Sequence, residues 1–216
     1  TFAKDTVEEA VQQFENDATG NLTAKNEEND NRTEYEYDDL NRLIKTTYAK
    51  NTTEEAVEII EYDDAGNQTA TVDANGNRTE YEYDEMNRLV KTIEADPDAS
   101  GPLTSPITTY EYDSSGNLTS VVDPLQQKTT YRYDGRNRLF ETIYADDSRE
   151  RLSYDFDDNL LANIDANGNQ TNMFYDVRNR LIRTIDSLQN VTTYDYDAAD
   201  LLIAVSDSNQ HKTLYD

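Results

Sequence analysis

The sequence has no cysteine and no tryptophan, a single histidine, His211, and only 4 prolines and 7 glycines. Without cysteine the chain can form neither a disulfide framework nor a thiolate metal site, and one histidine cannot supply a histidine-rich site. No apolar run approaches the ~20 residues that a bilayer-spanning helix needs. We therefore expect no cofactor, no dedicated metal centre and no membrane insertion.

Basic residues are also scarce. The chain has 19 Lys and Arg against 45 Asp and Glu, which gives a formal net charge of -26 and a mean hydropathy of -0.94. This charge repels phosphate backbones and anionic lipid, so nucleic-acid binding is disfavoured. Divalent cations and basic proteins are the partners that the charge favours.

What the sequence does contain is tyrosine, with 16 residues in a regular pattern. Segments of the form Tyr-x-Tyr-Asp, or close variants, recur at separations of 21, 25, 21, 29, 21, 23, 19, 21 and 21 residues. A fixed period in this range is the signature of a repeat architecture. We interpret residues 1–216 as a single array of about ten units. The units at both ends are incomplete, which predicts a longer parent protein with more repeats.

Each unit contains two turn motifs. The first has the form Asp-x-x-[Gly/Asn]-[Asn/Arg]-Leu, as in residues 38–43, with a fourth residue that tolerates positive φ. The second, at residues 73–77 and 165–169, carries the Asn-Gly pair typical of a hairpin. Residues 123–127 take the same place without Asn-Gly, which leaves their turn type open. The unit at Tyr154 has only Asp157-Asp158-Asn159-Leu160 and is expected to turn differently.

Between the turns the sequence alternates with a period of two. In residues 78–83, Thr79, Tyr81 and Tyr83 share one face and two glutamates share the other, as in a β-strand. The fold class predicted is all-β, a repetitive ribbon of antiparallel β-hairpins. Residues 53–60 and their counterpart 6–14 are interpreted as loop insertions with a turn of helix. Insertions at 50–56, 97–106 and 146–149 join the same two strand types, so they should lie along one edge.

These motifs resemble the YD repeat, also called the RHS repeat, of Rhs polymorphic toxins, Tc toxin shell subunits and teneurins. The resemblance is carried by three motifs and their arginines: Tyr35, Tyr37, Asp38 and Arg42; Tyr81, Tyr83, Asp84 and Arg88; Tyr131, Tyr133, Asp134 and Arg138. It implies a strip that spirals into part of a hollow shell or tube, which in the toxins encloses an effector polypeptide. The Pro- and Gly-rich segment that closes such shells has no match in this chain.

Several residue groups could in principle carry chemistry. Adjacent carboxylates such as Asp38-Asp39 and Asp157-Asp158 could serve a glycosidase, but an active site needs one place and these pairs recur through the array. They are better interpreted as turn-capping aspartates. Residues 73–77 resemble a calcium loop only superficially, because the EF-hand spacing of Gly and Glu is missing. We therefore assign no catalytic, cofactor or metal residue.

Arginine, tyrosine and histidine side chains also receive structural roles. Arg42 and its equivalents stand four residues after their turn aspartate, which favours pairing across the bend over a ladder for anionic ligands. The tyrosines could form platforms for sugars, but cross-strand ladders are the simpler role. His211 occupies a position in the second turn and is expected to be a turn residue.

The sequence thus predicts a non-enzymatic structural β-scaffold of a secreted or surface bacterial protein. In the first version it is a shell segment whose partners are an enclosed polypeptide and the neighbouring repeats of a longer chain. In the alternative version it is a repeat strip of an extracellular filament or adhesin, because open strand edges can pair with another chain. A glycan-binding or glycan-active protein is the third class.

Overall fold

The computed structural model describes residues 12–26, 31–98 and 104–215. The chain forms two compact units, Thr1–Thr109 and Tyr110–Asp216. The strands of the first unit are β1 (Gln13–Asn16), β2 (Leu22–Asn26), β3 (Arg32–Tyr37), β4 (Leu43–Tyr48), β5 (Ala56–Tyr62), β6 (Gln68–Val72), β7 (Arg78–Tyr83) and β8 (Leu89–Ile93), and β9 (Ile107–Tyr112) lies at the boundary. Those of the second unit are β10 (Leu118–Val122), β11 (Lys128–Tyr133), β12 (Leu139–Ile143), β13 (Arg149–Tyr154), β14 (Leu160–Ile164), β15 (Gln170–Tyr175), β16 (Leu181–Ile185), β17 (Val191–Tyr196), β18 (Leu202–Ser206) and β19 (Lys212–Leu214).

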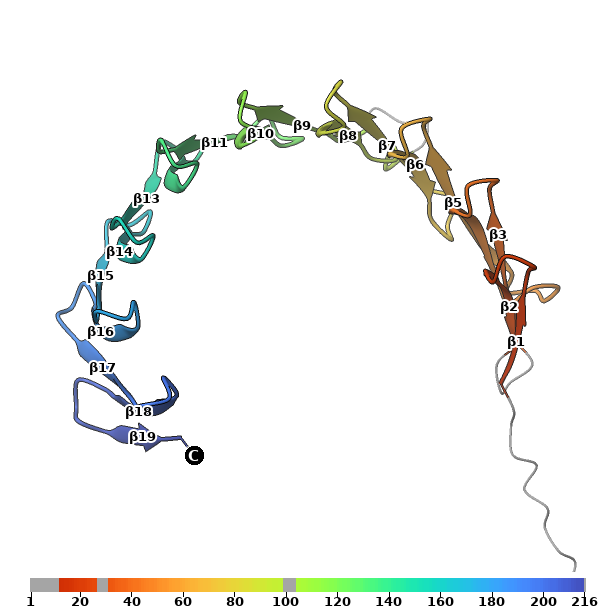
Figure 1. Cartoon of the computed structure of the whole chain (residues 1–216). Coiled ribbons are helices and arrows are strands. Elements are labelled where there is room, and N and C mark those ends of the chain that lie inside the picture. The colour runs from red at the N-terminus through yellow and green to blue at the C-terminus, as the bar shows by residue number, and fades with distance from the viewer. Residues whose placement is uncertain (1–11, 27–30, 99–103, 216) are drawn as a thin grey trace, which may run out of the picture. The chain divides into compact units, whose positions relative to one another are not determined.

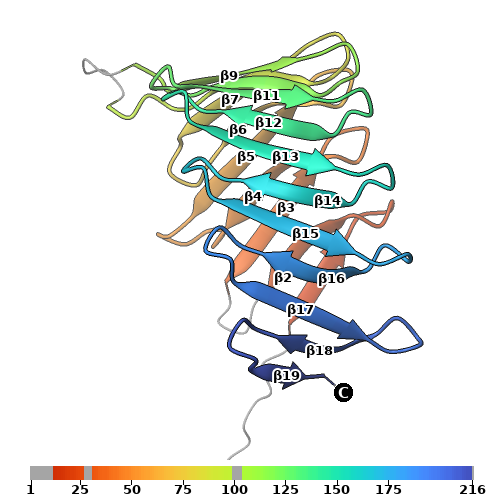
Figure 2. The same ribbon diagram turned by 90° about the vertical axis from the view of Figure 1, so that its left-hand side faces the viewer.

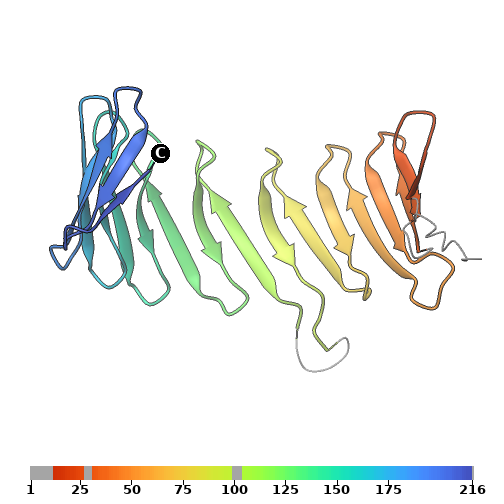
Figure 3. The ribbon, with the colours of Figure 1, turned by 90° about the horizontal axis from the view of Figure 1, so that it is seen from below.

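Within each unit the strands pair antiparallel with their chain neighbours, from β1 to β9 in the first unit and from β10 to β19 in the second. In the second unit the strands follow in chain order (Figure 1), and Figure 2 shows β11 to β19 stacked with alternating direction. Figure 3 shows the same arrangement for the strands of the first unit, coloured red to yellow. The predicted all-β hairpin ribbon is confirmed. The described residues include no helix that could cross a membrane.

One turn geometry closes both kinds of hairpin. In the turn at residues 134–138, the amide of Asp134 donates to the carbonyl of Arg138 at 2.9 Å, and the amide of Asn137 donates to the carbonyl of Asp134 at 3.0 Å. Asn137 has a φ of 60°, in the left-handed region. The turn at residues 73–77 makes the same two bonds, and its left-handed residue is Gly76, with a φ of 84°. The Asn-Gly hairpins are therefore three-residue turns that position a glycine in the left-handed region.

The two edges of the sheet differ by a β-bulge. Hairpins that follow a Tyr-x-Tyr-Asp motif shift register just before the second tyrosine, as between Arg132 and Tyr133. The alternate hairpins, such as β10–β11 and β12–β13, have no such shift. Because successive hairpins turn at opposite sides, all Tyr-Asp turns of a unit lie along one edge, which we call the bulged edge. We call the other side the plain edge.

The two faces of the sheet also differ. The Tyr face carries Tyr81 and Tyr83 of β7, whose side chains are half-buried, and the charged face carries the exposed Glu80 and Glu82. The predicted sharing of a face by the two tyrosines is thus confirmed. The residues at most 2% exposed include Ala24, Ala70 and Ala204, which lie on the charged face beneath longer neighbours. Among the described residues, this single sheet layer thus has no central apolar core. Instead, neighbouring side chains on each face cover one another.

The structure corrects two local expectations and determines one turn type that the sequence left open. The helical turn expected in residues 53–60 is wrong, because β5 begins at Ala56, where Val and Ile favour an extended chain. Its counterpart at residues 6–14 lies mostly outside the described residues. The turn after Tyr154 was expected to differ, but Asp155 begins a regular turn that ends at Asn159, with Asp158 at a φ of 69°. The turn at residues 123–127, whose type was open, has the common geometry, with Gln126 at a φ of 62°.

The insertions were expected to lie along one edge, and the two that the structure describes in full do so within their own units. Lys50 and its neighbours connect β4 to β5, and the insertion at 146–149 lies in the connection from β12 to β13 and the first residue of β13. Both connections lie at the plain edge of their own unit. Residues 99–103 of the third insertion lie outside the described residues.

Candidate functional site: the turn ladder of the bulged edge

Each Tyr-Asp turn is capped by its own aspartate. Asp134 Oδ1 accepts the amides of Arg136 and Arg138 at 2.8 and 3.1 Å, and Asp134 Oδ2 accepts Arg138 Nε at 2.8 Å. The predicted pairing of arginine with its own turn aspartate recurs at Arg42, Arg88 and Arg180. The turn-capping interpretation of the adjacent carboxylates is confirmed at Asp38. It is wrong for Asp157-Asp158, because Asp155 caps that turn and accepts the amides of Asp157 and Asn159 at 2.9 Å.

The caps hold their carboxylates in the charged form. The hydrogen bond from the Arg138 side chain, followed by the backbone amides, lowers the pKa of Asp134 to about 2. The bond from the Arg180 side chain does the same for Asp176, also to about 2. In Asp17, which lacks an arginine partner, the Thr19 hydroxyl is the main cause of a pKa of about 2. A carboxylate that accepts several N–H and O–H donors loses them on protonation, which favours the ionised state.

The same arginines reach the next Tyr-Asp turn along the bulged edge. The guanidinium of Arg138 lies 4.7 Å from the centroid of the Tyr154 ring, and Arg138 Nη1 donates to the Asp155 carbonyl at 2.9 Å. Arg138 Nη1 also lies 2.6 Å from Asp158 Oδ1. Arg138 thus joins its own turn cap, an aromatic ring and the following turn in one contact set. Arg42 over Tyr62 and Arg180 over Tyr196 repeat the stacking, at 4.4 and 4.8 Å.

Asparagine replaces arginine in the alternate Tyr-Asp turns. Asn117 Nδ2 donates to Asp113 Oδ2 in its own turn at 2.9 Å and to Asn137 Oδ1 in the next at 3.0 Å. The same step occurs from Asn21 to Asn41, from Asn67 to Asn87 and from Asn159 to Asn179. Asn and Arg therefore alternate as the residue that links one turn to the next, and we call this series of contacts the turn ladder.

The second tyrosine of five motifs adds a further link. The Tyr154 hydroxyl donates to the carbonyl of Leu139, the first residue of the preceding strand, at 2.9 Å. Tyr37, Tyr62, Tyr175 and Tyr196 make the equivalent bond to Leu22, Leu43, Leu160 and Leu181. The first tyrosine behaves differently. In the part of the chain that the structure describes, Tyr131 makes no such bond. These five tyrosines therefore tie their strands to the leucine beside the preceding bulge.

The motif residues named from the sequence occupy three different places. Tyr35, Tyr81 and Tyr131 lie within the Tyr face, Tyr37, Tyr83 and Tyr133 lie beside the bulge, and the aspartates and arginines form the turns. Sequence reasoning missed the links between turns. The signal for them is the alternation of Asn and Arg at the fifth turn position, at 21, 42, 67, 88, 117, 138, 159 and 180. His211 is a turn residue, as expected, and its amide donates to Asp207 Oδ1 at 2.8 Å.

The charged face is held by ion pairs that cross a strand. Arg78 of β7 contacts both carboxylate oxygens of Glu61 in β5 at 2.7 Å and Glu80 in its own strand at 3.0 Å. Between β5 and β7 lies Ala70 of β6, which is 0% exposed. A small residue in the middle strand thus leaves room for the arginine to reach across. Arg32 spans Ala24 in the same way, from Glu15 to Glu34.

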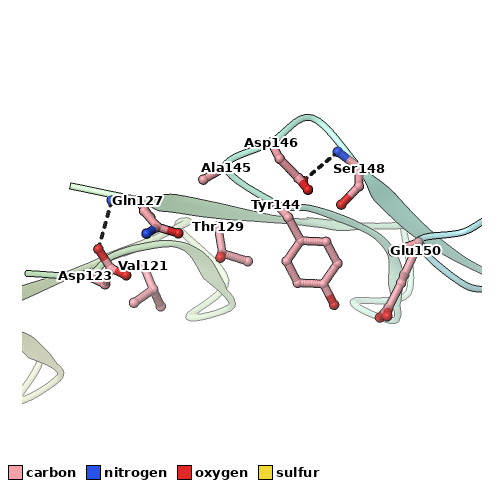
Figure 4. A pocket seen from close by; sticks show the side chains of 10 residues that line it. Val121, Asp123, Gln127, Thr129, Tyr144, Ala145, Asp146, Ser148 and Glu150 are labelled. Carbon is pink, nitrogen blue, oxygen red and sulfur yellow. Dashed lines mark hydrogen bonds between the residues drawn. The ribbon is translucent and has the colours of Figure 1, made fainter. Parts of the chain in front are cut away.

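A shallow depression of about 410 Å³ lies at the plain edge of the second unit (Figure 4). Asp123 and Asp146 line it, but each carboxylate already accepts a turn amide, from Gln127 at 2.8 Å and from Ser148 at 3.0 Å. The Glu150 carboxylate beside Tyr144 raises the pKa of that tyrosine. Within residues 12–26, 31–98 and 104–215, no group of three or more His, Cys, Asp or Glu side chains is placed to hold a metal ion.

Comparison with known proteins places the chain among repeat proteins of this kind. The family model described as Teneurin YD-shell matches residues 7–142, and the model described as RHS Repeat matches residues 175–212. A search of curated protein sequences returns no match.

Solved structures resemble the fold. A crystal structure of TcdB2-TccC3-TEV matches 95% of this chain at 15% identity with a TM-score of 0.74, and one of TcdB2-TccC3-Cdc42 matches 91% at 15% identity with a TM-score of 0.72. A structure of the Photorhabdus luminescens Tc holotoxin pore matches 94% at 17% identity with a TM-score of 0.57. The chain spans only 11% to 14% of the length of those chains.

Proposed function

The chain belongs to the Teneurin YD-shell family, and from this premise we propose that it is a non-enzymatic wall segment of a secreted or surface-exposed bacterial protein. In this proposal the hairpin strip encloses a polypeptide that belongs to the same, longer protein. The likeness of the fold to Tc toxin structures supports it.

The turn ladder is the observation that carries this proposal. Asn117 links one Tyr-Asp turn to the next and Arg138 links that turn to the one after, so the contacts extend over three successive Tyr-Asp turns. Such an edge can continue for as many units as the chain supplies, because each repeat contacts only its neighbours. The first aspartate of each Tyr-Asp turn is engaged in a cap, as at Asp38 and Asp134.

The Tyr face of the second unit offers a surface for the enclosed polypeptide. Phe140, Leu161, Ile182 and Ile203 stand at the same position in β12, β14, β16 and β18, and each is 37% to 40% exposed. Large apolar side chains that recur along one face without a covering layer are suited to contact another chain. The tyrosine hydroxyls between them keep the surface wettable, which suits an unfolded or partly folded occupant.

Protease protection in the parent protein tests the proposal. The native protein is incubated with trypsin, and the fragments are identified by mass spectrometry before and after denaturation. The proposal predicts that sequence outside the repeat array survives until the wall is unfolded. Equal digestion of that sequence in the native and the denatured protein contradicts it.

The filament or adhesin alternative rests on the single-layer sheet, in which strands pair with their chain neighbours, as β18 does with β17 and β19. If the full array does not close on itself, the strand at each of its ends has backbone donors and acceptors that can pair with another chain. In this alternative, the purified parent forms long assemblies that grow with protein concentration, and no segment of it is protected from protease.

A further inference from the structure

Three arginines of the second unit gather around one buried carboxylate on the charged face. Arg132 of β11 contacts Glu141 of β12 at 2.9 Å, and from β13 Arg151 contacts it at 2.9 Å and Arg149 at 3.4 Å. We call these four residues the arginine cluster. The Glu141 side chain is 5% exposed, whereas those of Arg132, Arg149 and Arg151 are 54%, 42% and 54% exposed.

The arginine cluster departs from its equivalents elsewhere in the array. In β3 and β4 the same cross-strand position pairs Glu36 with Lys45, and in β7 and β8 it pairs Glu82 with Lys91. Here the signs are exchanged, because Arg132 faces Glu141. The equivalent position in β15 and β16 pairs Phe174 with Arg183. The repeat therefore does not fix this pair, and among these four equivalent positions the exchanged signs occur at Arg132 and Glu141.

The strand that follows β12 adds further positive charge beside this pair. The residue of β5 opposite Lys45 is Ile59, and the residue of β9 opposite Lys91 is Thr109. The residue of β13 opposite Glu141 is Arg151, with Arg149 two positions away on the same face. Three guanidinium groups and one carboxylate leave a local charge of +2 on a chain whose formal charge is -26.

The guanidinium groups retain most of their donors. Each arginine carries five N–H donors, and within residues 104–215 each of these three makes one hydrogen bond, in every case to Glu141. Glu141 therefore anchors the three side chains from below, and their remaining N–H groups are available at the surface. The hydrogen bond from Arg151, with those from the neighbouring arginines, lowers the pKa of Glu141 and keeps it charged.

We propose that the arginine cluster binds an extended, carboxylate-rich segment of a partner polypeptide. The chemistry follows from the charged face itself, where basic side chains take carboxylates as partners, as Arg78 takes Glu61 and Glu80. At the arginine cluster one carboxylate serves three arginines, so two further carboxylates would restore the usual pairing. Planar guanidinium groups suit this role because they bind a carboxylate through two parallel N–H bonds.

The spacing of the strands favours an extended peptide. Arg132 on β11 and Arg151 on β13 are separated by one intervening strand, about 10 Å across the sheet. Alternate side chains of an extended peptide are about 7 Å apart on one face, and long Glu side chains cover the difference. A short run of acidic residues laid across β11 to β13 thus reaches both sets of arginines.

Binding of a fluorescent octaglutamate peptide tests the proposal. Anisotropy is measured with the 216-residue chain at low ionic strength, against an octaserine peptide as the reference. The result expected is saturable binding of octaglutamate that weakens as salt is added, because exposed charges are screened. Octaglutamate binding no tighter than that of octaserine would overturn the proposal.

Variants then locate the binding. The double variant Arg149→Gln with Arg151→Gln keeps the Arg132–Glu141 pair and should raise the Kd about tenfold. The matched control, Arg136→Gln with Arg178→Gln, changes the net charge equally in exposed turns and should leave the Kd within about twofold. Equal weakening by both double variants would mean that only net charge matters, which would refute the assignment. Circular dichroism confirms that each variant is folded.

One further variant and one competing ligand test the assignment in the same binding assay. Glu141→Gln removes the anchoring charge and keeps the three arginines, so it should tighten octaglutamate binding, a change that loss of structure cannot produce. Weaker or unchanged binding by this variant would contradict the proposal. A sulfated octasaccharide of matched charge is the competing ligand, and tighter binding of it than of octaglutamate would replace the polypeptide with a polysaccharide partner.

Discussion

The tyrosine links of the bulged edge lead to a prediction about Tyr154→Phe. This change removes only the hydroxyl that donates to the Leu139 carbonyl at 2.9 Å and leaves the aromatic ring beneath Arg138. The net contribution of such a hydrogen bond is about 1 kcal/mol, within a range of about 0.5 to 1.5 kcal/mol. For a unit of this size, that loss should lower the Tm by about 5 °C.

Combining the Tyr→Phe changes at the three equivalent positions should add their effects on the free energy of unfolding. Tyr154, Tyr175 and Tyr196 each bond the leucine at the start of the preceding strand, and they lie on β13, β15 and β17. These positions are separated by intervening strands, so their effects should add to about 3 kcal/mol. That is a large fraction of the roughly 5 to 15 kcal/mol that stabilises a typical domain.

Tyr131→Phe is the matched control. Tyr131 lies in the Tyr face of the same unit, and among the described residues its hydroxyl makes no bond of this kind, so its loss should cost about 0.5 kcal/mol or less. Urea unfolding at pH 7, followed by far-UV circular dichroism, measures Tyr154→Phe, the combined triple variant and Tyr131→Phe. Equal destabilisation by Tyr131→Phe and Tyr154→Phe would refute the reasoning, because the ring substitution itself would then be responsible.

Three further predictions follow from the turns and the charged face. Gly168→Ala should destabilise the second unit by about 1 kcal/mol because Gly168 has a φ of 83°, whereas Gly135→Ala, where an added Cβ meets nothing within 4 Å, should be neutral in the same thermal melt. The folded-state pKa of Asp134 is about 2, below its ordinary value of 3.8, so its cap stabilises the fold above about pH 4 and this contribution is lost as the pH falls toward 2. Acid titration followed by circular dichroism should show that loss, and Asp134→Asn should reduce the pH dependence in that window; an unchanged profile would contradict the assignment. Ala70→Leu should cost about 1 to 3 kcal/mol in chemical unfolding because Ala70 is fully covered by the Arg78 pairs, and a neutral effect would show that these pairs are not needed to cover it.

The repeat and its hairpins could be predicted because each depends on local rules. The alternation in residues 78–83 is sufficient to assign a strand, and an aspartate followed three residues later by Asn or Gly is sufficient to assign a turn. The turn after Tyr154 was misjudged for a simple reason. Its motif begins at Asp155, directly after the tyrosine, and the neighbouring Asp157 and Asp158 obscured that register. The helical interpretation of residues 53–60 failed because the strand preference of Val57, Ile59 and Ile60 outweighs the helix preference of the three glutamates in this segment.

The contacts between units could not be predicted from one unit alone. The spacing of Arg138 and Asp134 reveals their pairing, but the stacking of Arg138 on Tyr154 depends on how far one hairpin is displaced from the next. That displacement is set partly by the bulge before Tyr133, which leaves no mark in the composition. The arginine cluster was missed for a related reason. Its members come from three strands, and only the register brings Arg132, Glu141 and Arg151 into line.

Electron cryomicroscopy of the native parent protein tests the central claim most directly. If the strip is a wall segment, residues 12–215 should appear as adjacent hairpins in a layer one sheet thick, with density for other polypeptide on the side of the Tyr face. The links from Arg138 to Tyr154 and from Asn117 to Asn137 should be visible at the bulged edge. A filament with no enclosed volume, or a Tyr face exposed only to solvent, would contradict the account.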